Sequence, residues 1–211
     1  MIHPQPPSAQ GPRGAYAKTA ARRREIVEVA TGLFAREGYR SVTMLQVANA
    51  CGVSRTGLLH HFPTKESLLE EVLHAREETD AHRLDHLDRS RIDAVTALAD
   101  LVALIEHNTT IPAIINLYAV LSAEAADPTH PAHAYFVERY AGYSRALTAD
   151  FERARADGTL AAGVDPARFA VELIALMDGL QVQWLLDPRI DMVGMVRERI
   201  QSALTVPLPR A

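Results

Sequence analysis

Apolar residues in the first part of the chain recur every three or four positions, which is the spacing of one face of an α-helix. This pattern predicts a helix over residues 18–37, with an apolar face of Ile26, Val29, Ala30, Leu33 and Phe34. Gly38 follows at the position where many helices end in a left-handed residue. The residues before Lys18 are rich in proline and glycine, so we expect a disordered arm there.

Two short helices with a tight turn between them follow the first helix. Thr43 can cap the backbone amide of Gln46 while the Gln46 side chain reaches back, a capping box that opens a helix ending before Gly52. Ser54 can cap the next helix, which extends to about His61, and Gly52 supplies the positive φ that the turn requires. Two short helices arranged in this way form a helix-turn-helix.

The rest of the chain is also predicted to be helical. Pro63 cannot continue the preceding helix, and Thr64 can cap a new one from Lys65 to about Asp88. Beyond residue 90 no segment shows strand alternation. The expected helices there are one that includes Ile92–Ile105, one opened by Pro112 and stopped at Asp127–Pro128, one over about 131–156 ended by Gly158, one from Asp165–Pro166 through Leu186, and a last one that includes Val193, Val196, Ile200 and Leu204. The predicted fold class is all-α, with an N-terminal three-helix helix-turn-helix domain followed by a larger helical domain.

The front of the chain is basic although the whole chain is acidic. Residues 1–66 contain nine Lys or Arg and four Asp or Glu, whereas the net charge of the 211 residues is −4. This asymmetry indicates that the front third meets a polyanion, unless it is only a solvated basic segment. We expect four parts: a basic arm (1–17), the helix-turn-helix domain (18–66), the larger helical domain (67–206) and a tail (207–211).

Composition excludes several classes of protein. A hydrophobic content of 48% is enough for a buried core. The single cysteine, Cys51, excludes an internal disulfide framework, and we interpret it as a small buried residue, with a redox sensor as the alternative. The first residues lack the apolar stretch of a signal peptide, and no later segment holds 18 uncharged apolar residues. A soluble cytoplasmic protein with no membrane segment is therefore expected.

The second helix of the helix-turn-helix begins with side chains suited to the major groove of DNA, which such a helix enters N-terminus first. Arg55 can donate two hydrogen bonds to a guanine edge, Thr56 can contact a base, and Gly57 lets the backbone come close to the DNA. Lys65, at the start of the next helix, can bind a phosphate, and Thr43 is similarly placed on the other side.

The segment LFAREGYRSVTMLQVANACGVSRTGLLHHFPTKESLL, within residues 26–69, resembles the DNA-binding domain of the TetR family of transcriptional regulators. The resemblance includes the turn glycine, the G-V-S step, the H-F pair and the K-E-S-L-L that follows. The family usually has a tyrosine where this chain has Leu59, so the backbone or base contact is assigned to His60. The expected DNA-binding residues are Thr43, Gln46, Ser54, Arg55, Thr56, Gly57, His60, His61 and Lys65, with minor-groove or phosphate contacts from Arg22, Arg23 and Arg24.

The last two predicted helices carry more apolar residues than a small core needs, although an ordinary monomer core is the alternative. The stretch MDGLQVQWLLDP is similar to the penultimate helix of many TetR-like regulators, whose last two helices form a four-helix dimer interface. The resemblance therefore implies a homodimer that reads a palindromic double-stranded DNA operator. The interface residues expected from it are Leu176, Gly179, Leu180, Gln183, Trp184, Val193, Val196 and Ile200.

The resemblance also implies a repressor that leaves its operator when a small molecule binds the C-terminal domain and shifts the fourth helix. Polar or aromatic residues interrupt the apolar faces of the central helices, and we expect them to line the ligand pocket: His107, Asn116, Tyr118, Tyr140, Tyr143 and Trp184. A largely apolar lining with few polar anchors favours a hydrophobic or aromatic effector. No cofactor is expected.

The alternative function is an all-α metal-binding protein or enzyme whose N-terminal helices are only structural. Its best support is a set of residues at four-residue spacing on the fourth helix: His74, Glu78, His82 and His86. The same helix is rich in other charged residues, which is typical of a solvated surface helix, so no metal site is predicted.

Overall fold

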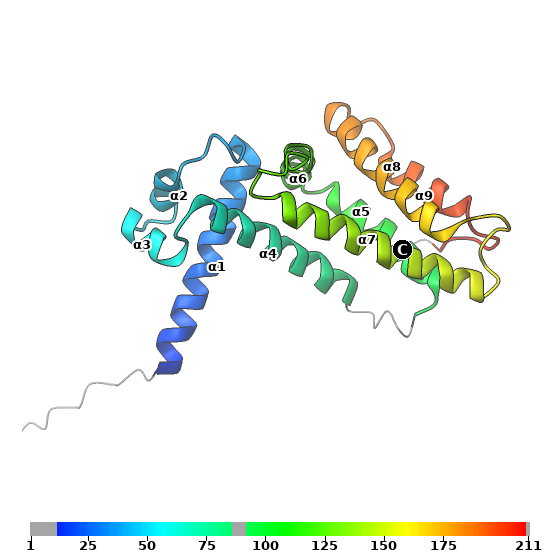
Figure 1. Ribbon diagram of the computed structural model, residues 1–211, viewed down its shortest axis with the longest axis horizontal. Helices are drawn as coiled ribbons and strands as arrows, with labels where there is room; N and C mark the ends of the chain where they lie inside the picture. Colours follow the sequence, from blue (N-terminus) through cyan, green and yellow to red (C-terminus); the bar gives the residue numbers. More distant parts are fainter. Residues whose placement is uncertain (1–11, 86–91, 210–211) are drawn as a thin grey trace, which may run out of the picture. The chain divides into compact units, whose positions relative to one another are not determined.

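The computed structural model describes residues 12–85 and 92–209 (Figure 1). Nine helices occupy most of these two ranges: α1 (Pro12–Glu37), α2 (Met44–Ala50), α3 (Arg55–His61), α4 (Lys65–Asp85), α5 (Ala94–Asn108), α6 (Pro112–Glu124), α7 (His133–Ala156), α8 (Pro166–Leu186) and α9 (Met192–Gln201). An isolated antiparallel bridge joins Leu160 to Leu204. The prediction of an all-α fold is confirmed.

The chain divides into two compact units, residues 1–72 and 73–211. The division falls inside α4, slightly further along the chain than the domain boundary expected after residue 66. Each unit has its own core.

The core of the N-terminal unit is built by α1, α2, α3 and the start of α4. Helix α2 packs against both α1 and α3. The almost completely buried side chains include Ile26, Phe34, Leu58, Phe62, Leu68 and Leu69. Burying each of these large apolar side chains contributes about 1.5–3 kcal/mol, so α3 is held firmly by its inner face.

The local signals around the helix-turn-helix form as the sequence predicts. Gly38 and Gly52 have φ angles of 82° and 65°. Thr43 and Gln46 form the complete capping box at the start of α2. The Ser54 side chain accepts a hydrogen bond from the backbone amide of Gly57 at the start of α3. Each such cap contributes about 1 kcal/mol, which helps to stabilise helices of only seven residues.

Helix α1 begins earlier than its sequence pattern predicts. It starts at Pro12, so residues 12–17, which were assigned to the arm, are helical. Proline is well accepted in the first turn of a helix, and the segment from Ala15 to Lys18 consists mostly of residues with good helix propensity. The remainder of the expected arm, residues 1–11, lies outside the described residues.

The C-terminal unit is a bundle in which α8 packs against α6, α7 and α9, while α5 packs against α7 and α9. Its fully buried residues include Leu98, Val102, Phe151, Leu173, Val196 and Ile200. Asp93 and Asp165 cap α5 and α8. Helix α9 ends at Gln201, so the prediction that Leu204 belongs to the last helix is wrong. The backbone of Leu204 forms the bridge to Leu160 instead.

Candidate functional site

The first turn of α3 is a polar surface on a firmly packed helix. Ser54, Arg55 and Thr56 are exposed, whereas Leu58 on the other side is completely buried. The backbone of Gly57 is partly exposed, and its amide donates to Ser54 Oγ at 3.0 Å. A Cβ atom at Gly57 would lie 3.3 Å from the same oxygen, so any larger residue there would press on the cap.

The two polar residues expected on α2 are exposed and bonded to each other. The backbone amide of Thr43 donates to Gln46 Oε1 at 2.8 Å, and the amide of Gln46 donates to Thr43 Oγ1 at 3.2 Å. Their hydrogen bonds fix the start of α2 while their outer sides remain open to solvent.

Lys65 is anchored at the start of α4. Its Nζ donates to the carbonyl oxygen of Arg40 at 3.2 Å and lies 4.4 Å from the centre of the Tyr39 ring. Burial lowers the pKa of Lys65, although neighbouring Glu66 opposes this effect. Burial also raises the pKa of Tyr39 to about 12, so its phenol stays neutral at physiological pH.

The three arginines of α1 have different surroundings. Arg23 donates to both carboxylate oxygens of Glu71 and, at 2.8 Å, to the carbonyl oxygen of His61. Its guanidinium carbon also lies 4.2 Å from the centre of the Phe62 ring. These donors hold α1, α3 and α4 together, and the DNA contact expected of Arg23 stays a prediction. Arg22 pairs with Glu25 at 2.8 Å, and Arg24 is exposed.

The adjacent histidines at the end of α3 also differ. The His60 ring is exposed and the His61 ring is partly buried, with 5.7 Å between the ring centres.

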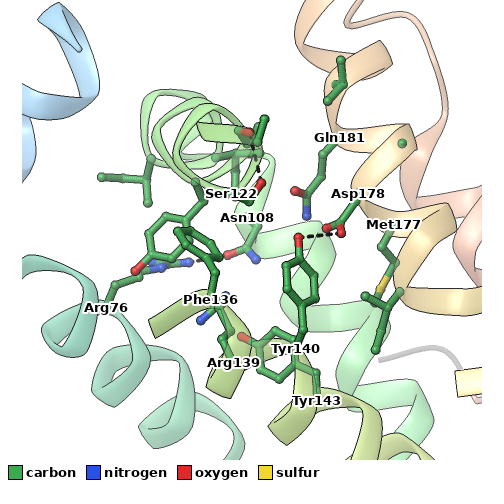
Figure 2. Close-up of a pocket in the computed structure, with 18 residues that line it drawn as sticks. Arg76, Asn108, Ser122, Phe136, Arg139, Tyr140, Tyr143, Met177, Asp178 and Gln181 are labelled. Carbon is green, nitrogen blue, oxygen red and sulfur yellow. Dashed lines mark hydrogen bonds between the residues drawn. The ribbon is translucent and has the colours of Figure 1, made fainter. Parts of the chain in front are cut away.

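The C-terminal unit contains a cavity of about 350 Å³ (Figure 2). Its walls come from α4, the end of α5, α6, α7 and α8. Aromatic and aliphatic side chains make up most of the lining, and a few polar groups interrupt it. This combination of size and lining is typical of a site for a small organic molecule.

Three of the six residues expected in a pocket line this cavity: Tyr118, Tyr140 and Tyr143. The other three do not, and the expectation for them is corrected. Asn116 lies on the exposed side of α6, Trp184 packs against the core, and at the end of α5 it is Asn108 rather than His107 that lines the cavity. The other polar lining residues were not predicted from the sequence: Arg76, Asn108, Ser122, Arg139, Asp178 and Gln181.

Arg139 lies in the wall of the cavity inside a cluster of tyrosines. Its guanidinium carbon is 4.9 Å from the ring centre of Tyr118 and 4.5 Å from that of Tyr143. It donates to Glu77 Oε1 at 3.1 Å and to the Tyr135 hydroxyl at 3.2 Å. The spacing of Tyr135, Arg139 and Tyr143 at four residues was the sequence signal that could have revealed this cluster.

The same cluster ties α4 to the cavity walls. The hydroxyls of Tyr118 and Tyr135 donate to the carbonyl oxygen of Leu73 on α4, at 3.0 and 3.4 Å. Arg76, also on α4, donates to Asn108 Oδ1 at 2.6 Å. A molecule that moved these walls would therefore act directly on α4.

Tyr140 and Asp178 meet at the cavity from α7 and α8, as Figure 2 shows. The Tyr140 hydroxyl donates to Asp178 Oδ2 at 2.8 Å. Burial raises the pKa of Asp178, although the bond from Tyr140 and the charge of Arg139 oppose the shift. Burial, followed by the bond to Asp178, raises the pKa of Tyr140 to about 12.

The residues expected at a dimer interface lie mostly inside the subunit, and the expectation is corrected for the three that are buried. Leu180, Val196 and Ile200 are buried, and three others pack partly buried against the same core: Leu176, Trp184 and Val193. Only Gly179 and Gln183 are exposed. The helices have two apolar sides, and periodicity alone did not distinguish the inner side from the outer one.

The outer side of α8 is nevertheless apolar. Its exposed residues include Val171, Val182 and Leu186, with exposures of 58%, 48% and 83%, and Met195 on α9 is 46% exposed. In the described ranges, α8 is long and apolar enough by itself to cross a membrane, and α5 and α6 would qualify together but for a 105° bend. Only 28% of the apolar window of α8 is buried.

No group of three or more His, Cys, Asp or Glu in the described part of the chain is arranged to hold a metal ion. Of the four residues that supported the metal-binding alternative, His86 and the side chain of His82 lie outside the described residues. The His74 ring packs against Tyr135, with 5.6 Å between the ring centres. Cys51 is buried, and burial raises the pKa of its thiol, which disfavours the reactive thiolate.

Two family models match the chain, and together they cover more than half of it. The model of bacterial regulatory proteins of the tetR family matches residues 26–72. The model of the C-terminal part of BetI-type transcriptional repressors matches residues 119–205.

Curated relatives agree with these models. The HTH-type transcriptional repressor KstR2 of Rhodococcus jostii is 38% identical over 68 residues, which are 32% of this chain and only 31% of that protein. The HTH-type transcriptional regulator TtgR of Pseudomonas putida is 25% identical over 195 residues, covering 86% of this chain and 89% of that protein.

Solved structures have the same fold. A TetR-family regulator from Rhodococcus sp. has a TM-score of 0.73 and 22% identity, covering 88% of this chain and all of the other. A regulator from Saccharomonospora viridis in complex with choline has a TM-score of 0.71, also with 22% identity, covering 88% and 98%. At this level of identity the likeness shows the fold alone.

The fold and the exposed start of α3 define a helix-turn-helix transcriptional regulator with a helical, cavity-bearing second unit. The chain belongs to the TetR family of bacterial transcriptional regulators. It is therefore a DNA-binding regulator of a ligand-responsive kind, and the alternative of an all-α enzyme or metal-binding protein is not favoured.

Proposed function

We propose that the protein is a homodimeric repressor that leaves a palindromic operator when a small, largely hydrophobic molecule enters the cavity of the C-terminal unit. The observation that carries this proposal is the start of α3, where Arg55 and Thr56 are exposed on a helix fixed by buried Leu58. A helix held in this way offers its side chains to base edges without rearrangement.

The DNA contacts that we propose fall into two groups. Arg55, Thr56 and Gly57 read base edges, because they lie in the first turn of α3. The remaining residues bind phosphates or sugars and position the helix: Arg22, Arg24, Thr43, Gln46, Ser54, His60, His61 and Lys65. The exposed His60 ring takes the role that the resemblance assigns to a tyrosine at Leu59.

The exposed apolar side of α8, with Met195 of α9, is the proposed dimer interface. A patch of this kind is costly to leave in water, and a second copy of the chain would cover it symmetrically. Gly179, which also borders the cavity, is exposed three residues before Val182 on α8. A Cβ atom there would meet no atom within 4 Å, so two α8 helices could approach closely. This interface accounts for the apolar composition of α8 without a membrane, and we place the protein in the cytoplasm.

The route from effector to DNA is proposed to run through α4. Leu73 and Arg76 on this helix are bonded to Tyr118 and Asn108 of the cavity wall. The same continuous helix begins at Lys65, a proposed phosphate contact. An effector acts only to the extent that it binds the released conformation more tightly than the operator-bound one. No catalytic role is assigned to any residue.

Selection of binding sites from random duplex DNA at physiological salt tests the proposal. We expect enrichment of a palindrome whose half-sites are about 34 Å apart, or a multiple of that spacing. Arg55→Ala should weaken operator binding by about 1–3 kcal/mol, and it should relax the base specificity at one position in each half-site. Arg145→Ala, which removes an exposed charge on α7, is the control and should change nothing. Absence of enrichment with protein refolded to strip bound ligand would refute the proposal.

A further inference from the structure

In the part of the chain that the structure describes, no cation forms an ion pair with the carboxylate of Asp178 in the cavity wall. Among the described residues, the hydrogen bond found for it comes from the neutral Tyr140 hydroxyl, at 2.8 Å. Arg139 acts on it electrostatically but forms no ion pair with it. A partly buried carboxylate in apolar surroundings is costly unless a positive charge or further donors approach it.

The surfaces around this carboxylate also suit a positive charge. Phe136, Tyr140 and Tyr143 line the cavity, and the rings of Phe136 and Tyr140 lie 6.3 Å apart at an angle of 37°. The faces of aromatic rings carry negative electrostatic potential and attract ammonium groups. Met177 and Ile174 on α8 add apolar surface on which the rest of a ligand could pack.

The arginine at the centre of the tyrosine cluster is already engaged. Arg139 pairs with Glu77 and lies against the rings of Tyr118 and Tyr143, so its charge is compensated within the protein. Arg76 donates to Asn108. An anionic ligand would have to compete for these donors and would also face the carboxylate of Asp178. A cation would meet an acceptor that forms no ion pair with any described residue.

We infer that the effector is an organic cation, with a protonated or quaternary ammonium group against Asp178 and Tyr140 and an apolar body against the aromatic and aliphatic walls. This inference rests on the proposal that the cavity is the effector site, and it narrows the small hydrophobic molecule expected there to one chemical class. The cavity volume of about 350 Å³ fits a small ligand, such as one aromatic ring that carries an ammonium group.

Three probes of nearly the same shape separate charge from hydrophobicity. Benzyltrimethylammonium is the cation, neopentylbenzene its neutral isostere and phenylmethanesulfonate the corresponding anion. Binding to the full-length protein is measured without DNA, by calorimetry and by NMR titration of the probe. We expect the cation to bind at least about tenfold more tightly than the neutral probe, and the anion most weakly. A cation that binds no better than its isostere, or not at all, overturns the inference.

Substitutions assign the preference to the proposed group. Asp178→Asn keeps an acceptor for Tyr140 but removes the charge, and it should abolish the preference for the cation while leaving binding of the neutral probe unchanged. Glu198→Gln, which removes an exposed charge on α9, is the matched control and should retain the preference. Tyr140→Phe leaves Asp178 in place and should weaken cation binding only several-fold, which provides a second readout. A preference that survives in Asp178→Asn overturns the inference.

These measurements can reject the ligand class and the proposed function separately. Loss of the cation preference with intact operator binding would reject only the ligand class. Absence of operator binding with an intact cation preference would reject the repressor and leave the cation site.

Discussion

At the scale of single residues, Arg22, Arg23 and Arg24 show how contacts distant in sequence change the role of a side chain. The three arginines look alike in the sequence, where all were assigned to DNA. Only the structure brings Arg23 to Glu71, 48 positions away. Local signals such as the capping box of Thr43 were predictable, because both partners lie within one helical turn. The pairing of Arg23 with Glu71 was not predictable, because only the folded chain brings α1 and α4 together at these residues.

This difference predicts opposite effects for two neighbouring substitutions. Arg23→Ala removes a bidentate ion pair, a bond to His61 and a ring contact, and should lower the free energy of unfolding by about 1–2 kcal/mol. Arg24→Ala removes an exposed charge and should change stability by less than about 0.5 kcal/mol. Arg24→Ala should instead make the plot of log binding constant against log salt concentration less steep, by about one unit of slope.

Urea denaturation and DNA titration at several salt concentrations check both expectations. Equal stability of the two variants would show that the Arg23 cluster contributes nothing, and an unchanged salt slope in Arg24→Ala would remove that residue from the DNA contacts.

At the scale of secondary-structure elements, helix boundaries were more predictable than helix faces. The Asp165–Pro166 start of α8 was read directly from the sequence, because capping chemistry is local. The outer side of α8 was not, since this helix is apolar around most of its circumference and its partners come from α6, α7 and α9. The cavity followed the same rule. The tyrosines on α6 and α7 were predicted, whereas Asp178 was missed because nothing local distinguishes it from a surface charge. Arg139 was missed although its four-residue spacing from Tyr135 and Tyr143 is a local signal of the cluster.

The outer side of α8 predicts how the oligomer should respond to charge. Val171→Glu combined with Leu186→Glu places two carboxylates on the proposed interface at positions that are 58% and 83% exposed in the subunit. The subunit should keep its helicity, while the dimer should weaken by at least about 100-fold, since each buried charge costs more than 1.4 kcal/mol. Operator affinity should fall with it.

Sedimentation equilibrium and circular dichroism measure these two properties. The control is Val137→Glu on α7, where the valine is 55% exposed but lies outside the proposed interface. A double variant that remains dimeric at the same concentrations would place the interface elsewhere.

At the scale of the whole molecule, α4 is the element through which a cavity ligand could change operator affinity. Glu77 is not part of the cavity lining, but its ion pair with Arg139 connects α4 to a residue that is. Coupling between two sites is a ratio of affinities and is reciprocal: the factor by which a ligand weakens operator binding equals the factor by which operator weakens ligand binding. A change in coupling can therefore be separated from any change in the affinity of either ligand.

Glu77→Gln should reduce the coupling, because it removes the charge that holds Arg139 to α4 while leaving the lining in place. We expect the operator dissociation constant measured with saturating benzyltrimethylammonium to approach the value measured without it, and the reciprocal titration to give the same smaller factor. Removing the Glu77 carboxylate leaves the charge of Arg139 uncompensated, so the cation itself should also bind more weakly. This change in affinity cancels in the ratio that measures the coupling. Glu78→Gln, the next residue on α4 and exposed, should preserve the coupling of the unmodified protein. Equal coupling in the two variants would mean that the Arg139–Glu77 pair only stabilises the C-terminal unit, and that the signal reaches α4 through the hydrogen bonds to Leu73 or from Arg76.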